Sequence, residues 1–228
     1  RLNGIDSCSH WCWNKTSLEV MAMRLIFALI APLILFSGCI ESTDFYGRSL
    51  NPNGPIEFEL YDQNDNQFNI SDIDTNLIMV GFIHTSCGEK CDNLTSSMAE
   101  SYDLLSNQER NTITLLSITT DPWHDDTNRL HYYMENNSVD WPHLTVMDIN
   151  AELAMMESVW AAFGTVVEIS EKQSQSMARC SIHLMDYTVN HTIHAILVDA
   201  ERNTRVQWLY SEWDSERVVA DIRRLASE

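Results

Sequence analysis

Basic residues are scarce in this chain. Lysine and arginine together account for 14 of its 228 residues, against 33 aspartates and glutamates, so the formal net charge at pH 7 is −19. A protein that binds nucleic acid, or that docks electrostatically on anionic lipid, needs a positive surface that neutralises phosphate groups. The composition therefore argues against both partner classes and favours an acidic, solubilising surface.

Long apolar runs are also lacking. The run at residues 25–36 is too short for a membrane span, but it follows Arg24 and precedes small residues, as in an export signal. Residues 35–39 (LFSGC) resemble a lipobox, in which the cysteine is lipidated and becomes the first mature residue. We therefore expect a lipid on Cys39, and a protein that is exported and anchored to the outer face of the cytoplasmic membrane.

These signals divide the chain into four parts: residues 1–20, absent from the mature protein; a lipoprotein-type signal peptide at 21–38; the lipidated cysteine and a polar tether at 39–55; and one domain at 56–228. If the upstream segment is instead retained, Cys8 and Cys12 form an alternative metal-binding motif.

Cysteine occurs at only six positions, and the predicted exported domain contains three of them, Cys87, Cys91 and Cys180. Disulfides persist outside the cytoplasm, but three cysteines are too few for a disulfide scaffold. One functional pair with one further cysteine fits this number better.

The functional pair lies between a buried strand, expected at residues 78–83, and a helix that begins at or just after Cys87. With three residues between them, Cys87 and Cys91 stand one helical turn apart on one face. The N–H groups and dipole of a helix N-terminus stabilise a thiolate. Two sulfurs so placed close a disulfide or bind one soft metal ion. Their neighbours are polar, which disfavours the alternative that both are buried core cysteines.

Strands and helices alternate along the domain, which predicts an α/β fold with a central mixed sheet flanked by helices. The first two strands form an N-terminal hairpin around a turn-rich segment at residues 62–66. Residues 168–187 form an insertion before the histidine strand, a central strand with His191 at its head. Strands are expected at 57–61, 67–70, 78–83, 113–118, 193–198 and 205–210; helices are expected after Cys87, from Asp125 or Asp126 to Met134, at 149–163 and at 218–225. This order is that of a thioredoxin-like domain.

From about Gly47 to Leu225 the chain resembles the Sco (SenC) family, thioredoxin-like copper proteins of respiratory-oxidase assembly. The matching segments are 58–64 (FELYDQN), 85–91 (TSCGEKC), 117–122 (SITTDP), 160–164 (WAAFG) and 189–192 (VNHT). In that family the two cysteines and a later histidine bind copper, so the resemblance implies that Cys87, Cys91 and His191 bind Cu(I) or Cu(II). This chain has Gly88, Glu89, Asp92 and Asn190 where the family usually has Pro, Asp, Pro and Asp. Because the three ligands are present, these departures should affect the properties of the site and the recognition of its partner more than metal binding itself.

Other residues are alternative ligands. His84, at the end of the strand before the dithiol, is the reserve ligand, and Cys180 and His183 in the insertion are the next alternative. His194 is expected to pack within the sheet or lie at its surface. The remaining histidines of the domain are expected to be surface or helix residues: His124, His131 and His143.

Three functions are compatible with the pair. The first is a membrane-tethered chaperone that delivers copper to a cytochrome oxidase subunit. The second is a thiol–disulfide oxidoreductase that keeps the acceptor's cysteines reduced, with Cys87 attacking and Cys91 resolving. The third is a thiol peroxidase that uses Cys87. Only the first requires His191. No proline follows Pro142, so the proline that faces the dithiol in a thioredoxin reductase is missing, which weakens the second interpretation.

Overall fold

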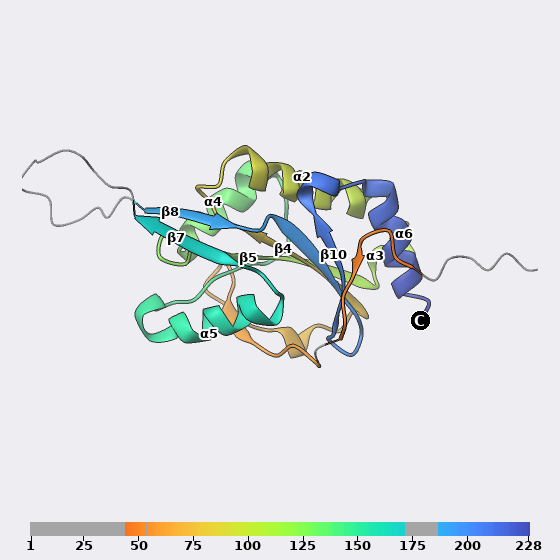
Figure 1. The fold of residues 1–228 in the computed structure, drawn as a ribbon, viewed down its shortest axis with the longest axis horizontal. Helices are drawn as coiled ribbons and strands as arrows, with labels where there is room; N and C mark the ends of the chain where they lie inside the picture. Colours follow the sequence, from red (N-terminus) through yellow and green to blue (C-terminus); the bar gives the residue numbers. More distant parts are fainter. Residues whose placement is uncertain (1–43, 53, 172–186) are drawn as a thin grey trace, which may run out of the picture. The chain divides into compact units, whose positions relative to one another are not determined.

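A six-stranded mixed sheet runs through the centre of the domain, in the order β1-β10-β9-β4-β5-β6 (Figure 1). β4, β5 and β6 are parallel to one another, whereas β9 runs antiparallel to both β4 and β10. Every residue of β4 and β9 is buried, because helices cover both faces of the sheet. The strands are β1 Arg48–Ser49, β4 Leu77–Ile83, β5 Ile113–Thr119, β6 His143–Leu144, β9 His194–Val198 and β10 Thr204–Leu209.

This computed structural model describes residues 44–52, 54–171 and 187–228. Within these ranges, no helix is both long and apolar enough to cross a bilayer. The predicted signal peptide, its Cys39 and the upstream Cys8 and Cys12 lie outside the described residues, as do Cys180 and His183.

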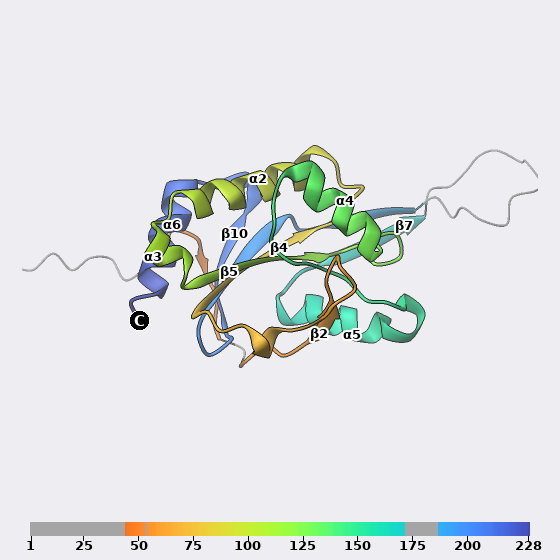
Figure 2. The same cartoon turned by 180° about the vertical axis from the view of Figure 1, so that it is seen from behind.

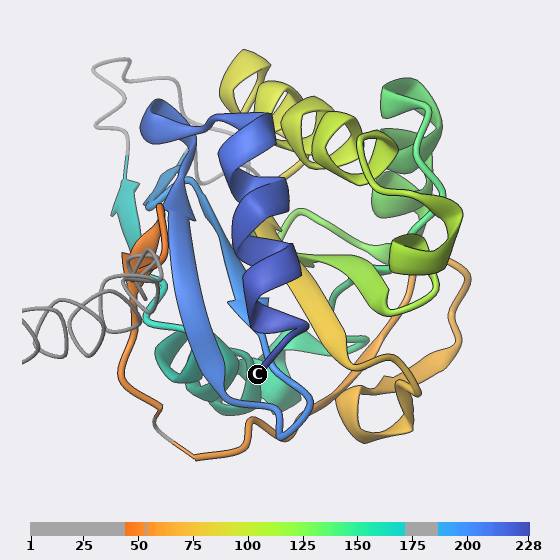
Figure 3. The ribbon, with the colours of Figure 1, turned by 90° about the vertical axis from the view of Figure 1, so that its right-hand side faces the viewer.

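The helices form two layers around the sheet (Figures 2 and 3). On one face lie α2 (Glu89–Asp103), α4 (Thr127–Asn137) and α6 (Ser215–Leu225), with the short α3 (Asn107–Arg110) beside them; α5 (Ile149–Ala162) covers the other face. Alternate residues of β4 enter different cores, since successive side chains of a strand point to opposite faces. Met79 packs in the core beneath α2, whereas Val80 packs in the core beneath α5.

Two antiparallel ribbons complete the domain. β2 (Glu59–Tyr61) and β3 (Gln67–Asn69) form the predicted N-terminal hairpin, followed by the 3-10 turn η1 (Ile70–Asp72). β7 (Val167–Glu171) and β8 (Tyr187–His191) form the second ribbon, which extends away from the sheet (Figure 1). A second 3-10 turn, η2 (Tyr210–Glu212), leads into α6. The predicted α/β fold with a central mixed sheet is confirmed.

The structure corrects two expectations about this region. The ends of the predicted insertion are the paired strands β7 and β8, while residues 172–186 lie outside the described part of the chain. His191 was expected at the head of a central strand, but it is the last residue of β8, and β9 begins at His194. The ribbon, rather than the central sheet, therefore carries His191.

His143 was expected at the surface or on a helix, and this is wrong. It lies in β6, fully buried, with its ring stacked on Trp141 and its Nδ1 donating to the Trp141 carbonyl at 2.9 Å. Burial lowers the pKa of His143 to about 4, which leaves the ring neutral. A neutral ring needs no counter-ion, which is why the hydrophobic interior accepts it.

His194 is also fully buried, as the sheet-packing expectation allowed. Its Nδ1 lies 2.7 Å from the Gln207 amide and its Nε2 lies 2.9 Å from the Thr165 hydroxyl, so both ring nitrogens are already bonded. Burial lowers the pKa of His194 to about 4. His194 is therefore a structural residue and is not free to bind a metal.

Candidate metal centre

The dithiol lies where two parallel strands end side by side. β4 ends at Ile83 and β5 at Thr119, and the carboxyl ends of neighbouring parallel strands share one edge of a sheet, where ligands commonly bind. Between β4 and α2 the chain forms a short loop, residues 84–88, that contains Cys87. Gly88 precedes the helix with φ 70°, a left-handed conformation that glycine adopts without strain.

Cys87 and Cys91 form a disulfide in the structure, with their Cα atoms 5.7 Å apart. Because α2 begins at Glu89, Cys87 lies in the loop before the helix and Cys91 in its first turn. This differs slightly from the expectation that both stand on one helix face. Cys91 is fully buried, whereas Cys87 is half-buried and lines a cavity. The structure thus describes the oxidised form of the pair.

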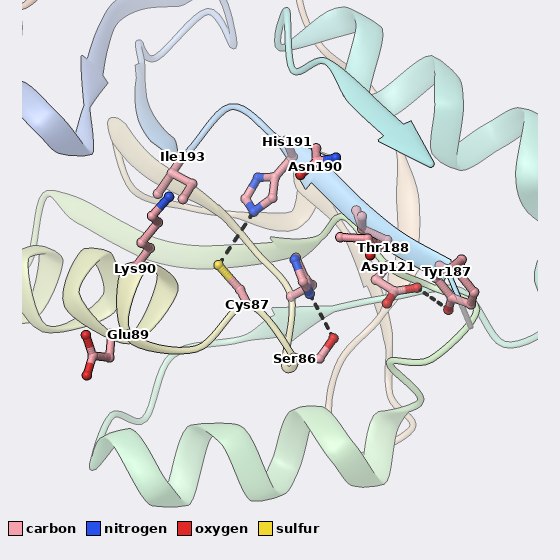
Figure 4. A pocket seen from close by; sticks show the side chains of 12 residues that line it. Ser86, Cys87, Glu89, Lys90, Asp121, Tyr187, Thr188, Asn190, His191 and Ile193 are labelled. Carbon is pink, nitrogen blue, oxygen red and sulfur yellow. Dashed lines mark hydrogen bonds between the residues drawn. The ribbon is translucent and has the colours of Figure 1, made fainter. Parts of the chain in front are cut away.

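His191 approaches the disulfide from the ribbon. Its Nε2 lies 3.6 Å from Cys91 Sγ. The same nitrogen lies 3.9 Å from Cys87 Sγ, the contact drawn in Figure 4. Its Nδ1 lies 3.1 Å from the Thr192 carbonyl, and since a carbonyl only accepts, Nδ1 carries the ring proton. Burial, with a smaller effect from nearby His84, lowers the pKa of His191 to about 4. At neutral pH its Nε2 therefore presents a free lone pair to the sulfurs.

His84 is a further nitrogen donor at this site. It is buried, with 6% of its surface exposed, and its ring stands edge-on to that of His191 at a centroid distance of 5.3 Å. One donor atom from each of His84, Cys87 and His191 lies within 4.8 Å of the other two. Burial lowers the pKa of His84, against the opposing effect of nearby Asp125 and Asp121.

A cavity of about 630 Å³ opens beside these side chains (Figure 4). Two residues in it were not anticipated as site residues, Asp121 and Tyr187, and the Tyr187 hydroxyl donates to Asp121 Oδ1 at 2.7 Å. Burial raises the pKa of the Asp121 carboxyl. The sequence held a signal for both, because Asp121 closely follows a predicted strand and Tyr187 lies four positions before His191.

Asp125 holds the dithiol loop against β5. Of the two residues at which the helix was expected to begin, Asp126 caps α4, whereas Asp125 is fully buried. Its carboxylate accepts from the Thr85 backbone N–H at 3.0 Å, from the Thr85 hydroxyl at 2.5 Å and from the Thr119 hydroxyl at 2.6 Å. Through these bonds Asp125 connects Thr85, in the dithiol loop, to Thr119 at the end of β5.

The donor set determines which ion the site accepts. Thiolates are soft ligands that select Cu(I), and a neutral imidazole suits copper in either oxidation state. Two sulfurs and one unprotonated nitrogen already lie together here, so Cys87, Cys91 and His191 fit copper once the disulfide is reduced.

The chain is similar to one protein family and to several solved structures of that family. A model of the SCO1/SenC family matches residues 49–227, whereas no curated protein matches the chain. Among solved structures, apo Sco1 from Thermus thermophilus is 19% identical with a TM-score of 0.64, and the match covers 82% of this chain and 99% of that one. Copper-bound ScoI from Bradyrhizobium japonicum is 18% identical with a TM-score of 0.60, covering 75% and 98%.

A SCO1/SenC family lipoprotein from Bacillus anthracis is 19% identical with a TM-score of 0.62, and the match covers 80% of this chain and 99% of that one. At these identities the likeness establishes the fold, which is the thioredoxin-like fold of the Sco proteins, as predicted.

Proposed function

Since the chain belongs to the SCO1/SenC family, we propose that it is a copper chaperone, which holds its cargo between Cys87, Cys91 and His191. The observation that carries this proposal is the approach of a neutral imidazole nitrogen to within 3.9 Å of both sulfurs. Neither thiol exchange nor peroxide reduction requires that nitrogen. The copper-bound ScoI of Bradyrhizobium japonicum supports the choice of metal.

Loading requires the dithiol form. Two electrons and two protons from a thiol reductant convert the Cys87–Cys91 disulfide into two thiols, which lose their protons when Cu(I) binds. Two thiolates and one Cu(I) carry a net charge of −1, and Lys90 in the cavity wall provides a nearby positive charge. Delivery proceeds by ligand exchange, in which cysteines of a copper-accepting subunit of a respiratory oxidase replace the three ligands one at a time.

A Cu(I) titration of the purified protein tests this function. The reduced protein is expected to bind one Cu(I) per chain with high affinity, because it offers two thiolates and an unprotonated nitrogen. The protein with the Cys87–Cys91 disulfide intact is expected to bind none tightly, because a disulfide sulfur carries no charge. Equal binding by the two forms, or no binding by the reduced form, would contradict the proposal.

A second candidate function is that of a thiol–disulfide oxidoreductase, and the disulfide itself favours it. The half-buried Cys87 is accessible from the cavity and would attack a partner's disulfide, after which the buried Cys91 would resolve the mixed disulfide. A peroxidase that uses Cys87 needs the same access. The chaperone remains the better account because it gives His191 a role.

We further propose that Cys39 carries the lipid that anchors the domain to the outer face of the cytoplasmic membrane, with residues 39–55 as tether. The Bacillus anthracis relative is itself a lipoprotein. We expect intact-mass analysis of membrane fractions to find a chain that begins at a lipid-modified Cys39. A water-soluble product, or one that keeps residues 1–38, would disprove the anchor and leave the copper site unaffected.

A further inference from the structure

We propose that His84 is a fourth ligand at this centre, used when the ion is Cu(II). The inference rests on the proposed copper function and extends it, because three ligands suffice for Cu(I) whereas Cu(II) favours four ligands in tetragonal geometry, with nitrogen among them. Together with His191 and the two sulfurs, His84 would provide a set of two nitrogens and two sulfurs.

The distances between donors fit one shared ion. Metal bonds of about 2.0–2.3 Å place neighbouring donor atoms about 3.3 Å apart and opposite ones up to about 4.5 Å apart. His191 Nε2 lies 3.6 Å and 3.9 Å from the two sulfurs, and a ring nitrogen of His84 joins Cys87 and His191 within 4.8 Å. The donor atoms of His84, Cys87 and His191 therefore lie within a few tenths of an ångström of the separations that one shared ion needs. Reduction of the disulfide lets the two sulfurs move apart, so that Cys91 can bind the same ion.

The surroundings of His84 orient it for this role. Its Nδ1 lies 3.1 Å from the Ser86 hydroxyl, so we assign Nε2 as the metal-binding nitrogen, with Ser86 fixing the tautomer as partners of metal-bound histidines do. The chain on either side of His84 is held in place, because β4 ends at Ile83 and Asp125 binds both the N–H and the hydroxyl of Thr85.

Cu(II) binding at this set involves no electron transfer. The two thiols of the reduced pair release their protons, and the two imidazoles bind in their neutral forms. The sulfurs and His191 are shared by both oxidation states, so His84 is the one ligand whose removal should affect Cu(II) more than Cu(I).

The test replaces His84 by phenylalanine, which keeps a ring of similar size but removes the nitrogen. The control, His131→Phe, makes the same change at a partly exposed residue of α4, which forms an ion pair with Glu135 and is not part of the dithiol site. Reduced, Cu(II)-loaded protein labelled with ¹⁵N-histidine is studied by electron paramagnetic resonance. We expect two coordinated nitrogens in wild type and in His131→Phe, and one in His84→Phe.

Affinity provides a second measurement. In His84→Phe we expect the Cu(II) affinity to fall at least about 10-fold. Loss of a residue that only hydrogen-bonds to a metal ligand already lowers affinity by about that factor, and a direct ligand should matter more. The Cu(I) affinity should change much less. One coordinated nitrogen in wild type, or two retained in His84→Phe, would overturn the inference. A wild-type spectrum with one nitrogen overturns the inference whether or not the variant folds, and the comparison of His84→Phe with His131→Phe assigns the second nitrogen.

The two proposals fail in different ways. If wild-type protein binds copper through one nitrogen, the chaperone function stands and only the role of His84 is lost. If reduced wild-type protein binds neither Cu(I) nor Cu(II), the copper function fails, and the inference about His84 fails with it.

Discussion

Replacing either Cys87 or Cys91 by serine is expected to abolish tight Cu(I) binding. Serine keeps the size of the side chain but removes the soft thiolate, which is the ligand that selects Cu(I). Loss of a residue that hydrogen-bonds to a metal ligand lowers metal affinity by about 10- to 100-fold, and the loss of the ligand itself should lower it more. The measurement is a competition titration of each reduced variant against a Cu(I) chelator of known affinity.

Cys180→Ser is the matched control for loss of a thiol, and it is expected to bind Cu(I) like the wild type. Undiminished binding in Cys91→Ser would locate the copper elsewhere, with Cys180 and His183 the first residues to test. A loss in Cys180→Ser as large as that in Cys91→Ser would have the same meaning.

The second large effect is expected from His191→Ala. Copper affinity should fall strongly, since the imidazole that lies within 3.9 Å of both sulfurs is lost, while the Cys87–Cys91 disulfide still forms and is still reduced. Thiol–disulfide exchange depends on the two sulfurs and on the thiolate pKa. A Cu(I) titration beside a redox titration of the same variant measures both properties.

The pH dependence of copper affinity can be compared between the wild type and His191→Ala. Copper affinity should fall as the pH drops, because the thiols, with ordinary pKa values of about 8.5, must lose protons to bind. Burial lowers the pKa of His191 to about 4, so its imidazole is neutral above that pH and becomes protonated only as the pH falls through it. Wild type and His191→Ala should therefore show parallel pH dependence from pH 8 down to about 5.

If His191→Ala binds copper like the wild type, His191 is only a residue at the end of β8. The oxidoreductase would then become the better account of the dithiol. Conversely, if the variant also loses the ability to form its disulfide, the histidine positions the sulfurs, and the separation between metal binding and exchange chemistry disappears.

The parts of this site that sequence could predict are those marked by local patterns. The apolar run before Cys87 and the helical period after Cys91 place both cysteines correctly between β4 and α2. The family resemblance supplied His191, because nothing in the spacing of residues says that a ribbon folds back onto the dithiol. The role of these three residues in binding copper stays a prediction.

Local patterns in the sequence do not indicate the residues whose role depends on tertiary contacts. His143 and Asp125 have polar side chains, yet both residues are fully buried. The backbone N–H of His143 donates to Gln63, 80 positions earlier, and Asp125 accepts from Thr85, 40 positions earlier. Only the folded chain brings these partners together. Asp121 and Tyr187 meet across 66 positions of sequence. A pattern of hydrophobicity indicates which face of an element is apolar, but it does not show which polar side chains find partners inside.

The proposed ligands also join distant parts of the chain, since His191 lies 104 positions after Cys87. In an unfolded chain, bringing these ends together costs entropy that grows with the length of the intervening loop. Copper bound across them would act as a reversible cross-link, and at a free concentration 1,000 times its dissociation constant it would add about 4 kcal/mol to the free energy of unfolding. Delivery of the copper would remove that cross-link. The empty chaperone would then unfold at a lower temperature, and proteases would cleave it faster, than the copper-loaded form.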